Sequence, residues 1–357
     1  MSFTHKILII LTPGFPADEA DITCLPAQQR FIQILQQNFP GRNMIIVTVQ
    51  YPAVSKEYHW NNVKVISLGI QKGFYKRFAW MKIWNTLKQL RRENEIAGLL
   101  CFWCTEHSLP AFWFARTYHL PHYCWILGQD AKKNNHVVKL IRPRASELIA
   151  LSDSLADEFY KNYRITPRYV IPMGVDGNLS HENHTDRFLD LIGAGSLIPL
   201  KQYELFLETV KYLTRSYPEL KAVICGSGPE KCLLQSKIKE LQIERNLKLA
   251  GELPHDELIA IMHHAKIFLH PSSYEGFSSA CLEALSAGAH VISFHKPMHE
   301  EIPHWHQVHT IREMYIKAAE LLQEDALSAE PVIPFSMQNA VNDIMVLFGY
   351  HSFTNSI

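Results

Sequence analysis

The sequence predicts an α/β protein with two domains, each built on a parallel sheet. Apolar strand-like runs alternate with helical stretches along almost the whole chain, which is typical of parallel sheets covered by helices. The chain has 357 residues, more than one ordinary core accommodates. A polar segment, GNLSHENHTDR at 177–187, interrupts the alternation and is typical of a hinge. We therefore expect domains at 1–175 and 176–335, followed by a C-terminal segment at 336–357.

In the first domain the alternation predicts strands near 6–11, 43–49, 63–68, 97–104, 122–127, 146–151 and 168–171. Helices are expected between them, near 25–38, 76–93, 108–119 and 152–163. In sheets of this kind ligands bind beyond the carboxyl ends of the strands. The loop from Thr12 to Pro26 should therefore reach a ligand.

In the second domain the same pattern predicts strands near 188–194, 220–225, 246–250, 266–270, 290–294 and 306–310. Helices are expected near 202–216, 230–242, 254–264 and 311–324, with a last helix at 336–348. Between Ser278 and Gly288 lies one more short helix, which Ser278 or Ser279 can cap and Gly288 can close.

Two carboxylates, Glu275 and Glu283, bracket this short helix. The helix is apolar nearly all round and should be buried, with Glu283 as its only charge. A buried carboxylate needs hydrogen-bond donors, and the diol of a sugar or ribose supplies two hydroxyls. The loop amides at 276–278 suit an anion or a sugar hydroxyl. Alternatively, Glu283 only favours the helix dipole and Glu275 is solvated.

The spacing of the two carboxylates within HPSSYEGFSSACLEALSAGAHVI resembles the signature of retaining glycosyltransferases of family 4, group 1 type. The resemblance implies the GT-B fold, in which two Rossmann-like parallel-sheet domains face each other across a cleft. It implies that the N-terminal domain binds the acceptor and the C-terminal domain a nucleotide-sugar donor. It also implies that the helix in 336–357 crosses back to the N-terminal domain.

The same resemblance implies roles for single residues. Glu283 would hold the ribose hydroxyls of the donor. The sugar would be held by Glu275 and by the backbone amides of Gly276, Phe277 and Ser278.

The segment GAGSLIPLKQYELF at 193–206 suits a diphosphate, because loop amides, a helix dipole and the cation Lys201 converge there. The alternative is a solvated surface lysine. The resembling family usually has an Arg five residues before this Lys, but here Ser196 offers one hydrogen bond and no charge. Lys132 and Lys133 are candidates to supply the missing positive charge.

A second departure from the family lies at 127–130. Family members commonly have His-Gly-x-Asp there, and this chain begins the motif with Leu127. The role of that His would pass to Gln129 or Asp130, or be dispensed with, because the departing phosphate can take the acceptor's proton. For Asp130 the alternative is a helix cap or a turn residue.

Two weaker matches complete the donor site that the resemblance implies. Gly14 resembles the glycine that approaches the phosphates, and Gly251 to Leu253 match the backbone that holds the base. The chain has no Asp-x-Asp motif, so we expect no metal and no cofactor other than the donor as co-substrate. The His-rich run from His295 to His309 lacks zinc-site spacing and should be a solvated loop.

The chain carries 35 basic and 35 acidic residues, which gives no general attraction for nucleic acid.

The segment 72–92, KGFYKRFAWMKIWNTLKQLRR, has seven cations, no acid and interleaved aromatic residues. It suits the surface of an anionic membrane, or else packs on the core with a solvated cationic side. The apolar run near the N-terminus is too short for a signal peptide or a membrane span. We therefore expect a cytoplasmic protein with peripheral contact to the inner face of the membrane.

Together these features predict retaining transfer of a sugar from a nucleotide-diphosphate sugar to a glycan or lipid-linked acceptor. Two alternatives stay open, because a fold does not determine a function. One is a non-catalytic protein that binds a nucleotide sugar, and the other is a GT-B phosphorylase or epimerase.

Overall fold

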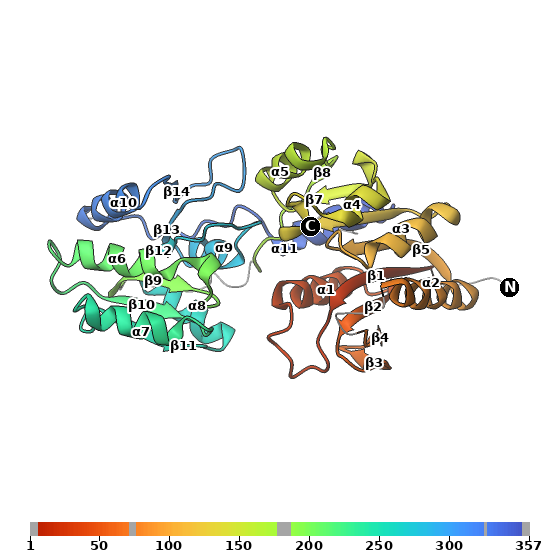
Figure 1. Cartoon of the computed structure of the whole chain (residues 1–357), viewed down its shortest axis with the longest axis horizontal. Coiled ribbons are helices and arrows are strands. Elements are labelled where there is room, and N and C mark those ends of the chain that lie inside the picture. The colour runs from red at the N-terminus through yellow and green to blue at the C-terminus, as the bar shows by residue number, and fades with distance from the viewer. Residues whose placement is uncertain (1–5, 71–75, 177–186, 325–326, 352–357) are drawn as a thin grey trace, which may run out of the picture. The chain divides into compact units, whose positions relative to one another are not determined.

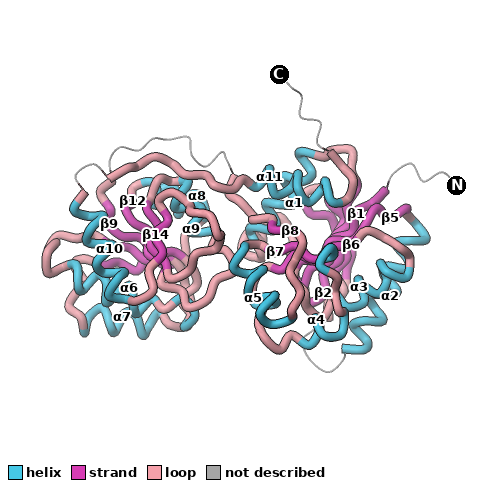
Figure 2. The backbone as a smooth tube through the Cα atoms, turned by 90° about the horizontal axis from the view of Figure 1, so that it is seen from above, coloured by secondary structure: helices cyan, strands magenta, loops and turns pink. Residues whose placement is uncertain are grey.

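A computed structural model of the chain describes residues 6–70, 76–176, 187–324 and 327–351. The chain forms two compact units, the first from Met1–Met173 with Met337–Ile357 and the second from Gly174–Ser336 (Figure 1). Figure 2 shows the strands of each unit gathered between helices. The predicted fold class, with two α/β units on parallel sheets, is confirmed.

The first unit has an eight-stranded sheet in the order β3-β4-β2-β1-β5-β6-β7-β8. Its strands are β1 (Lys6–Gly14), β2 (Asn43–Tyr51), β3 (Lys56–Trp60), β4 (Val63–Ser67), β5 (Glu95–Phe102), β6 (His122–Ile126), β7 (Leu148–Ala150) and β8 (Tyr169–Val170). Its helices include α1 (Pro26–Asn38), α2 (Lys76–Glu93), α3 (Ser108–Thr117), α4 (His136–Ile141) and α5 (Asp153–Tyr163). The central strands are apolar on both faces, as expected when helices cover both sides of a sheet.

One edge of this sheet differs from the prediction. Strand β3, which the alternation did not reveal, pairs antiparallel with β4. The two strands are joined by Asn61 and Asn62, whose φ angles of 44° and 65° are left-handed. Two left-handed residues form the tight hairpin turn that asparagine favours. The short helix α4 was also not predicted.

The second unit has a six-stranded parallel sheet in the order β11-β10-β9-β12-β13-β14. Its strands are β9 (Leu189–Ala194), β10 (Ala222–Cys225), β11 (Leu247–Gly251), β12 (Ala265–His270), β13 (His290–Ser293) and β14 (Trp305–Gln307). Its helices include α6 (Tyr203–Leu213), α7 (Lys231–Glu240), α8 (His255–His263), α9 (Ser279–Ser286) and α10 (Ile311–Gln323). The alternation predicted all of these elements to within a few residues.

The last helix, α11 (Met337–Leu347), follows the second unit in sequence but packs against α1 of the first. Beyond it, the ring of Phe348 lies 5.0 Å from that of Tyr123. A side chain at Gly98 would approach Phe348 Cε1 to 2.5 Å, so the glycine makes room for this ring. The chain therefore completes its first unit with its C-terminal helix.

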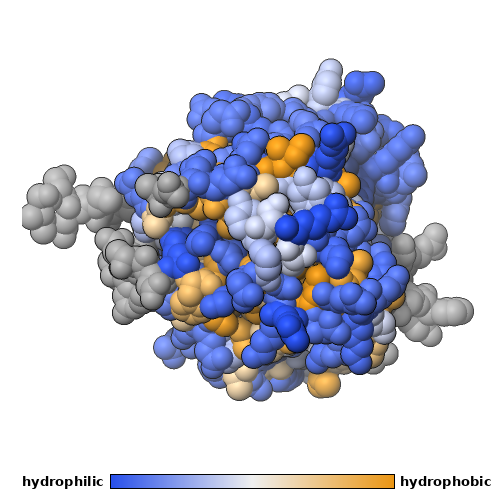
Figure 3. All heavy atoms as spheres, turned by 90° about the vertical axis from the view of Figure 1, so that its left-hand side faces the viewer, coloured by the Kyte–Doolittle hydropathy of each residue, from blue (hydrophilic) through white to orange (hydrophobic). Residues whose placement is uncertain are grey.

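The surface is mainly polar where Figure 3 shows it, with hydrophobic side chains only in small groups. Across the part of the chain that the structure describes, no helix has both the length and the apolar character of a membrane span.

Candidate functional site

The candidate residues of the second unit all follow the carboxyl ends of its strands. Ser196 and Lys201 follow β9, Gly251 ends β11, and Glu275 follows β12. Because these strands are parallel neighbours, their carboxyl ends lie along one edge of the sheet. The fold therefore brings together loops that are far apart in sequence.

Glycines hold three of these loops against one another. At Gly226 a Cβ atom would lie 1.9 Å from the carbonyl oxygen of Gly195, and φ is +145°. The same Gly226 donates its backbone N–H to the carbonyl oxygen of Gly251 at 2.6 Å. Only a residue without a side chain allows such close approach in this conformation. The loops after β9, β10 and β11 are therefore fixed to each other.

A fourth loop is tied to the turn that carries Lys201. This turn spans Pro199–Lys201, and the carbonyl oxygen of Leu200 accepts hydrogen bonds from Ser272 Oγ at 3.2 Å and from Ser273 N at 2.9 Å. Lys201 Nζ then lies 2.6 Å from Glu275 Oε2. The two residues are 74 positions apart in sequence, and the docking of the loops makes them an ion pair.

Glu275 has a second partner, His270 at the end of β12. Its Nε2 lies 3.2 Å from Glu275 Oε2 and donates to it, because a carboxylate only accepts. Burial opposes ionisation of Glu275, but the hydrogen bond from His270 and the charge of Lys201 outweigh it and lower its pKa to about 2. Burial lowers the pKa of His270, which favours the neutral ring. At neutral pH the cluster is thus a carboxylate, an ammonium and a neutral imidazole.

The alternatives of a solvated Lys201 and a solvated Glu275 do not hold. Their side chains are only 18% and 23% exposed, and each charge is paired. Ser196 is exposed, and Gly251 has no heavy atom within 4 Å of the position of a Cβ. Leu253 is half-buried in the loop beyond β11.

Helix α9 has the predicted local structure. Ser278 caps it by accepting a hydrogen bond from the backbone N–H of Cys281 at 3.3 Å, and Gly288 follows its end with φ of +80°. Gly276, Phe277 and Ser278 are buried just before the helix. Their backbone thus lies in the enclosed turn that the sequence predicted to hold a ligand.

Glu283 is largely enclosed, as expected, but one of its hydrogen-bond donors is a protein side chain that the sequence did not indicate. Its side chain is 17% exposed, and its Oε1 lies 3.1 Å from Nε2 of His255, at the start of α8. The sequence could not show this pairing, because His255 precedes Glu283 by 28 positions and belongs to another helix. The carboxylate still lies on the edge of the sheet where the loops gather.

Residues 179–309 match the family described as "Glycosyl transferases group 1". The match covers less than half of the chain and lies entirely in the second unit. The group 1 segment includes every candidate residue of the second unit named above.

Curated proteins named as sugar transferases are similar to part of this chain. The 2-deoxystreptamine N-acetyl-D-glucosaminyltransferase of Niallia circulans is 29% identical over 99 residues, which are 28% of this chain and 25% of that protein. The GtfA subunit of the UDP-N-acetylglucosamine–peptide N-acetylglucosaminyltransferase of Streptococcus pneumoniae is 31% identical over 147 residues, 41% of this chain and 29% of that protein. The match thus spans less than a third of either relative.

Solved structures cover more of the chain. A glycosyltransferase from Rickettsia africae superposes with a TM-score of 0.73 at 13% identity, covering 98% of this chain and 100% of its own. The Anabaena protein HepE, solved with UDP and glucose, gives 0.68 at 14% identity, covering 97% and 99%. These likenesses show the fold, and the predicted GT-B architecture is confirmed.

In the first unit, outside the group 1 segment, Asp130 holds a turn together. Its carboxylate is buried and accepts backbone N–H groups from Cys104 at 2.8 Å, Gly128 at 2.9 Å and Leu127 at 3.2 Å. Burial outweighs these bonds and raises the pKa of Asp130 to about 6. The arrangement favours the turn-residue alternative over a catalytic one, because the carboxylate serves the backbone.

The other candidates of the first unit also follow the carboxyl ends of strands. Gln129 and Lys133 are exposed in the loop after β6, and the carbonyl oxygen of Lys132 accepts a hydrogen bond from the hydroxyl of Tyr163. Gly14 ends β1, where a side chain would contact Tyr51 Cβ at 3.4 Å.

The His-rich run is not simply a solvated loop. Trp305 is buried, and the rings of His304 and His306 stack on His290 with centroid distances of 4.2 and 5.3 Å. Burial and the neighbouring imidazoles lower the pKa of His290 to about 4, which keeps its ring neutral at pH 7. Within the described ranges, no three His, Cys, Asp or Glu side chains are grouped to hold a metal ion.

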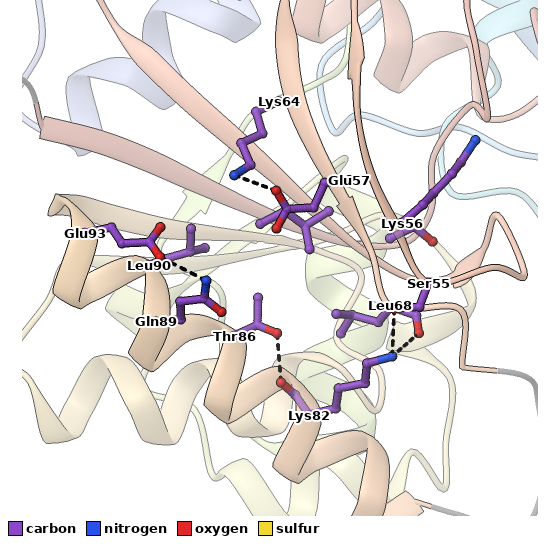
Figure 4. Close-up of a pocket in the computed structure, with 12 residues that line it drawn as sticks. Ser55, Lys56, Glu57, Lys64, Leu68, Lys82, Thr86, Gln89, Leu90 and Glu93 are labelled. Carbon is purple, nitrogen blue, oxygen red and sulfur yellow. Dashed lines mark hydrogen bonds and ion pairs between the residues drawn. The ribbon is translucent and has the colours of Figure 1, made fainter.

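A polar pocket of about 300 Å³ lies elsewhere, between β3, β4 and α2 (Figure 4). Its charged groups are engaged internally: Lys82 Nζ donates to the carbonyl oxygen of Leu68 at 2.6 Å and to Ser55 Oγ at 3.1 Å, and Lys64 pairs with Glu57 at 2.8 Å. No candidate residue lines this pocket.

Sequence reasoning missed His255 and His270 as partners of the two candidate carboxylates. The one available signal was position, since His270 ends a strand directly before Pro271 and His255 begins a helix directly after Pro254. Ligands bind at strand ends in such folds, so polar residues there merit notice. Besides His255 and His270, a third histidine, His295, lies near a strand end, after β13. Its buried Nε2 has no hydrogen-bond partner among the described residues.

Proposed function

We propose that this protein is a retaining family 4 glycosyltransferase that moves a sugar from a nucleotide-diphosphate sugar to a glycan or lipid-linked acceptor. The observation that carries the proposal is the cluster of Lys201, Glu275 and His270 at the carboxyl edge of the second sheet. It lies in the segment that matches group 1 glycosyltransferases. Sugar transfer also appears in the names of the relatives above.

Each residue has a role in binding the donor. Lys201 neutralises the leaving diphosphate, whose negative charge grows as the glycosidic bond breaks. Ionised Glu275 holds the ammonium group at 2.6 Å and accepts hydrogen bonds from sugar hydroxyls.

The other candidate residues bind the remaining parts of the donor. The amides at 276–278 bind the sugar, Glu283 binds the ribose, and Ser196 donates one hydrogen bond to the diphosphate. Gly251 and Leu253 border the base, and Gly14 leaves room near the phosphates.

On the acceptor side we propose that no side-chain base is needed. Leu127 replaces the family's His, and the Asp130 carboxylate binds three backbone N–H groups. The bond from the anomeric carbon to the phosphate oxygen breaks, and a bond to the acceptor oxygen forms on the same face. The acceptor's proton passes to the departing phosphate. Gln129, Lys132 and Lys133 are proposed to contact the acceptor or that phosphate.

The test is transfer from UDP-glucose and UDP-N-acetylglucosamine by the Lys201→Met and Glu275→Ala variants. We expect each to lose at least about 100-fold in kcat, the scale of removing one preorganised stabilising group. Lys221→Met is the control, because this exposed lysine precedes β10 at the opposite edge of the sheet. Near-normal turnover by either site variant would overturn the assigned roles.

The same assay addresses the remaining expectations. We propose that transfer needs no divalent metal, so activity should persist in EDTA. Donor binding without turnover on any acceptor would favour a non-catalytic binder. Products formed from inorganic phosphate or from the donor alone would favour a phosphorylase or an epimerase.

We further propose that α2 contacts an anionic membrane on its cytoplasmic side. Ile83 and Leu87 face the core, while Phe78 and Met81 are 55% and 59% exposed near the cationic residues of the helix. Residues 72–75 of the predicted segment lie outside the described residues. Sedimentation with anionic liposomes at low salt should be lost in Met81→Glu and retained in Ile316→Glu, an exposed apolar position on α10. Failure of the wild type to sediment would rule this contact out.

A further inference from the structure

His255 occupies one oxygen of the carboxylate assigned to the ribose. It lies on the first turn of α8, directly after the loop that follows β11. Its Nε2 is 3.1 Å from Oε1 of Glu283 and must be the donor, since the carboxylate only accepts. Among the residues that the structure describes, Oε2 of Glu283 has no hydrogen-bond donor. One oxygen thus serves the protein and the other remains for a ligand.

The charges that face His255 are both negative. Besides Glu283, the carboxylate of Asp256 lies 3.9 Å from its Nδ1 and is fully exposed. The hydrogen bond to Glu283 raises the pKa of His255, while partial burial opposes this rise. The start of α8 also disfavours a cation through the helix dipole. Protonation of His255 thus depends on Glu283, and solvent reaches the imidazole, which is 51% exposed.

We propose that His255 is a positioning residue for the nucleotide: it orients the Glu283 carboxylate toward the ribose diol and, as a cation, offsets its repulsion of the diphosphate. The inference rests on the proposed function, because it takes Glu283 as the group that binds the ribose. Without His255, Glu283 is free to rotate and places an uncompensated negative charge near an anionic ligand. The consequence is a donor affinity that depends on pH.

The direction of this dependence follows from the charge. Below its raised pKa, His255 is protonated and compensates Glu283; above it, the neutral ring still donates a hydrogen bond but carries no charge. Donor affinity should therefore fall as the pH rises through the pKa of His255. An ion pair with only a structural role would change the stability of the free protein without changing this profile.

The experiment is calorimetric binding of UDP-glucose, ADP-glucose and GDP-mannose at pH 6.0 and 8.5. Diphosphate diesters do not titrate in this range, so the protein sets the pH dependence. For the donor that binds, we expect about fivefold weaker affinity of the wild type at pH 8.5, the scale of one partly exposed charge pair. His255→Gln keeps an N–H donor without titrating and should bind with an affinity independent of pH. His255→Ala should bind weakly at both pH values.

Two further comparisons, one with a control variant and one with an altered donor, test whether His255 acts through Glu283. His264→Gln is the control, because this histidine precedes β12 at the amino edge of the sheet and stacks on Phe188; it should keep the wild-type profile. The 2′-deoxyribose form of the same donor should show a smaller difference between His255→Ala and the wild type at pH 6.0, because the diol that Glu283 binds is gone and only the charge compensation toward the diphosphate remains. A wild-type pH profile in His255→Gln would overturn the role of His255 alone. Failure of the wild type to bind any of the three donors would overturn the proposed function, and this inference with it.

Discussion

At the scale of single residues, the two carboxylates of the central motif receive their partners from different parts of the second unit. Glu275 binds Lys201 from the loop after β9 and His270 from the end of β12. Glu283 binds His255 from α8. The sequence analysis expected Glu283 to need hydrogen-bond donors, and in the structure a protein side chain supplies one of them. Each carboxylate is thus held in position before any ligand arrives.

Glu275→Gln should reduce the acid sensitivity of the fold. The pKa of Glu275 is lowered from 4.5 to about 2, so its contribution to stability is present above pH 4.5 and is lost as the pH falls from 4.5 to 2. We expect the variant to be about 2 to 3 kcal/mol less stable at pH 7 and to approach the wild type near pH 2. Urea unfolding across this range measures the difference. Glu301→Gln, at an exposed site, should follow the wild-type curve, and a constant gap for Glu275→Gln would contradict the assignment.

At the scale of elements, local signals predicted the helices and strands, and glycines decide how their loops meet. Ser278 caps α9 and Gly288 ends it as their residue types suggest. The contact of Gly226 with Gly195 is different, because it joins the loops of two neighbouring strands. Nothing in the sequence around Gly226 identifies the partner that it approaches.

Gly226→Ala should separate the loops after β9 and β10. The new Cβ would lie 1.9 Å from the carbonyl oxygen of Gly195, and φ of +145° is strained for alanine. We expect a loss of more than about 2 kcal/mol in the free energy of unfolding, together with weaker donor binding. Gly41→Ala is the control, since no heavy atom lies within 4 Å of its Cβ position. Equal melting temperatures for the two variants would show that the contact is not essential.

At the scale of the whole molecule, the chain forms two compact units and returns to the first with α11. The last helix and Phe348 are thus part of the N-terminal core. In sequence, the entire second unit separates them from the rest of that core. Stability of the first unit should therefore depend on the last residues that the structure describes.

Phe348→Ala tests this dependence. Phe348 is 9% exposed and packs on Tyr123, so its truncation should cost the first unit about 2 to 4 kcal/mol. Val346→Ala, at a position of α11 that is 45% exposed, should change stability by less than about 0.5 kcal/mol. Hydrogen exchange would assign the loss to amides of β1, β5 and β6. Loss of protection confined to the second unit would contradict the packing described.

The sequence by itself determined the α/β class, most of the elements and the helix that carries Glu283, because hydrophobic period, caps and glycines act within a few residues. It also placed Lys201 and Glu275 beyond strand ends. Only the tertiary structure decided that these two form an ion pair, that His255 binds Glu283 and that Asp130 binds a turn. The reason is that such pairs join residues far apart in the chain, and strand order and loop docking bring them together.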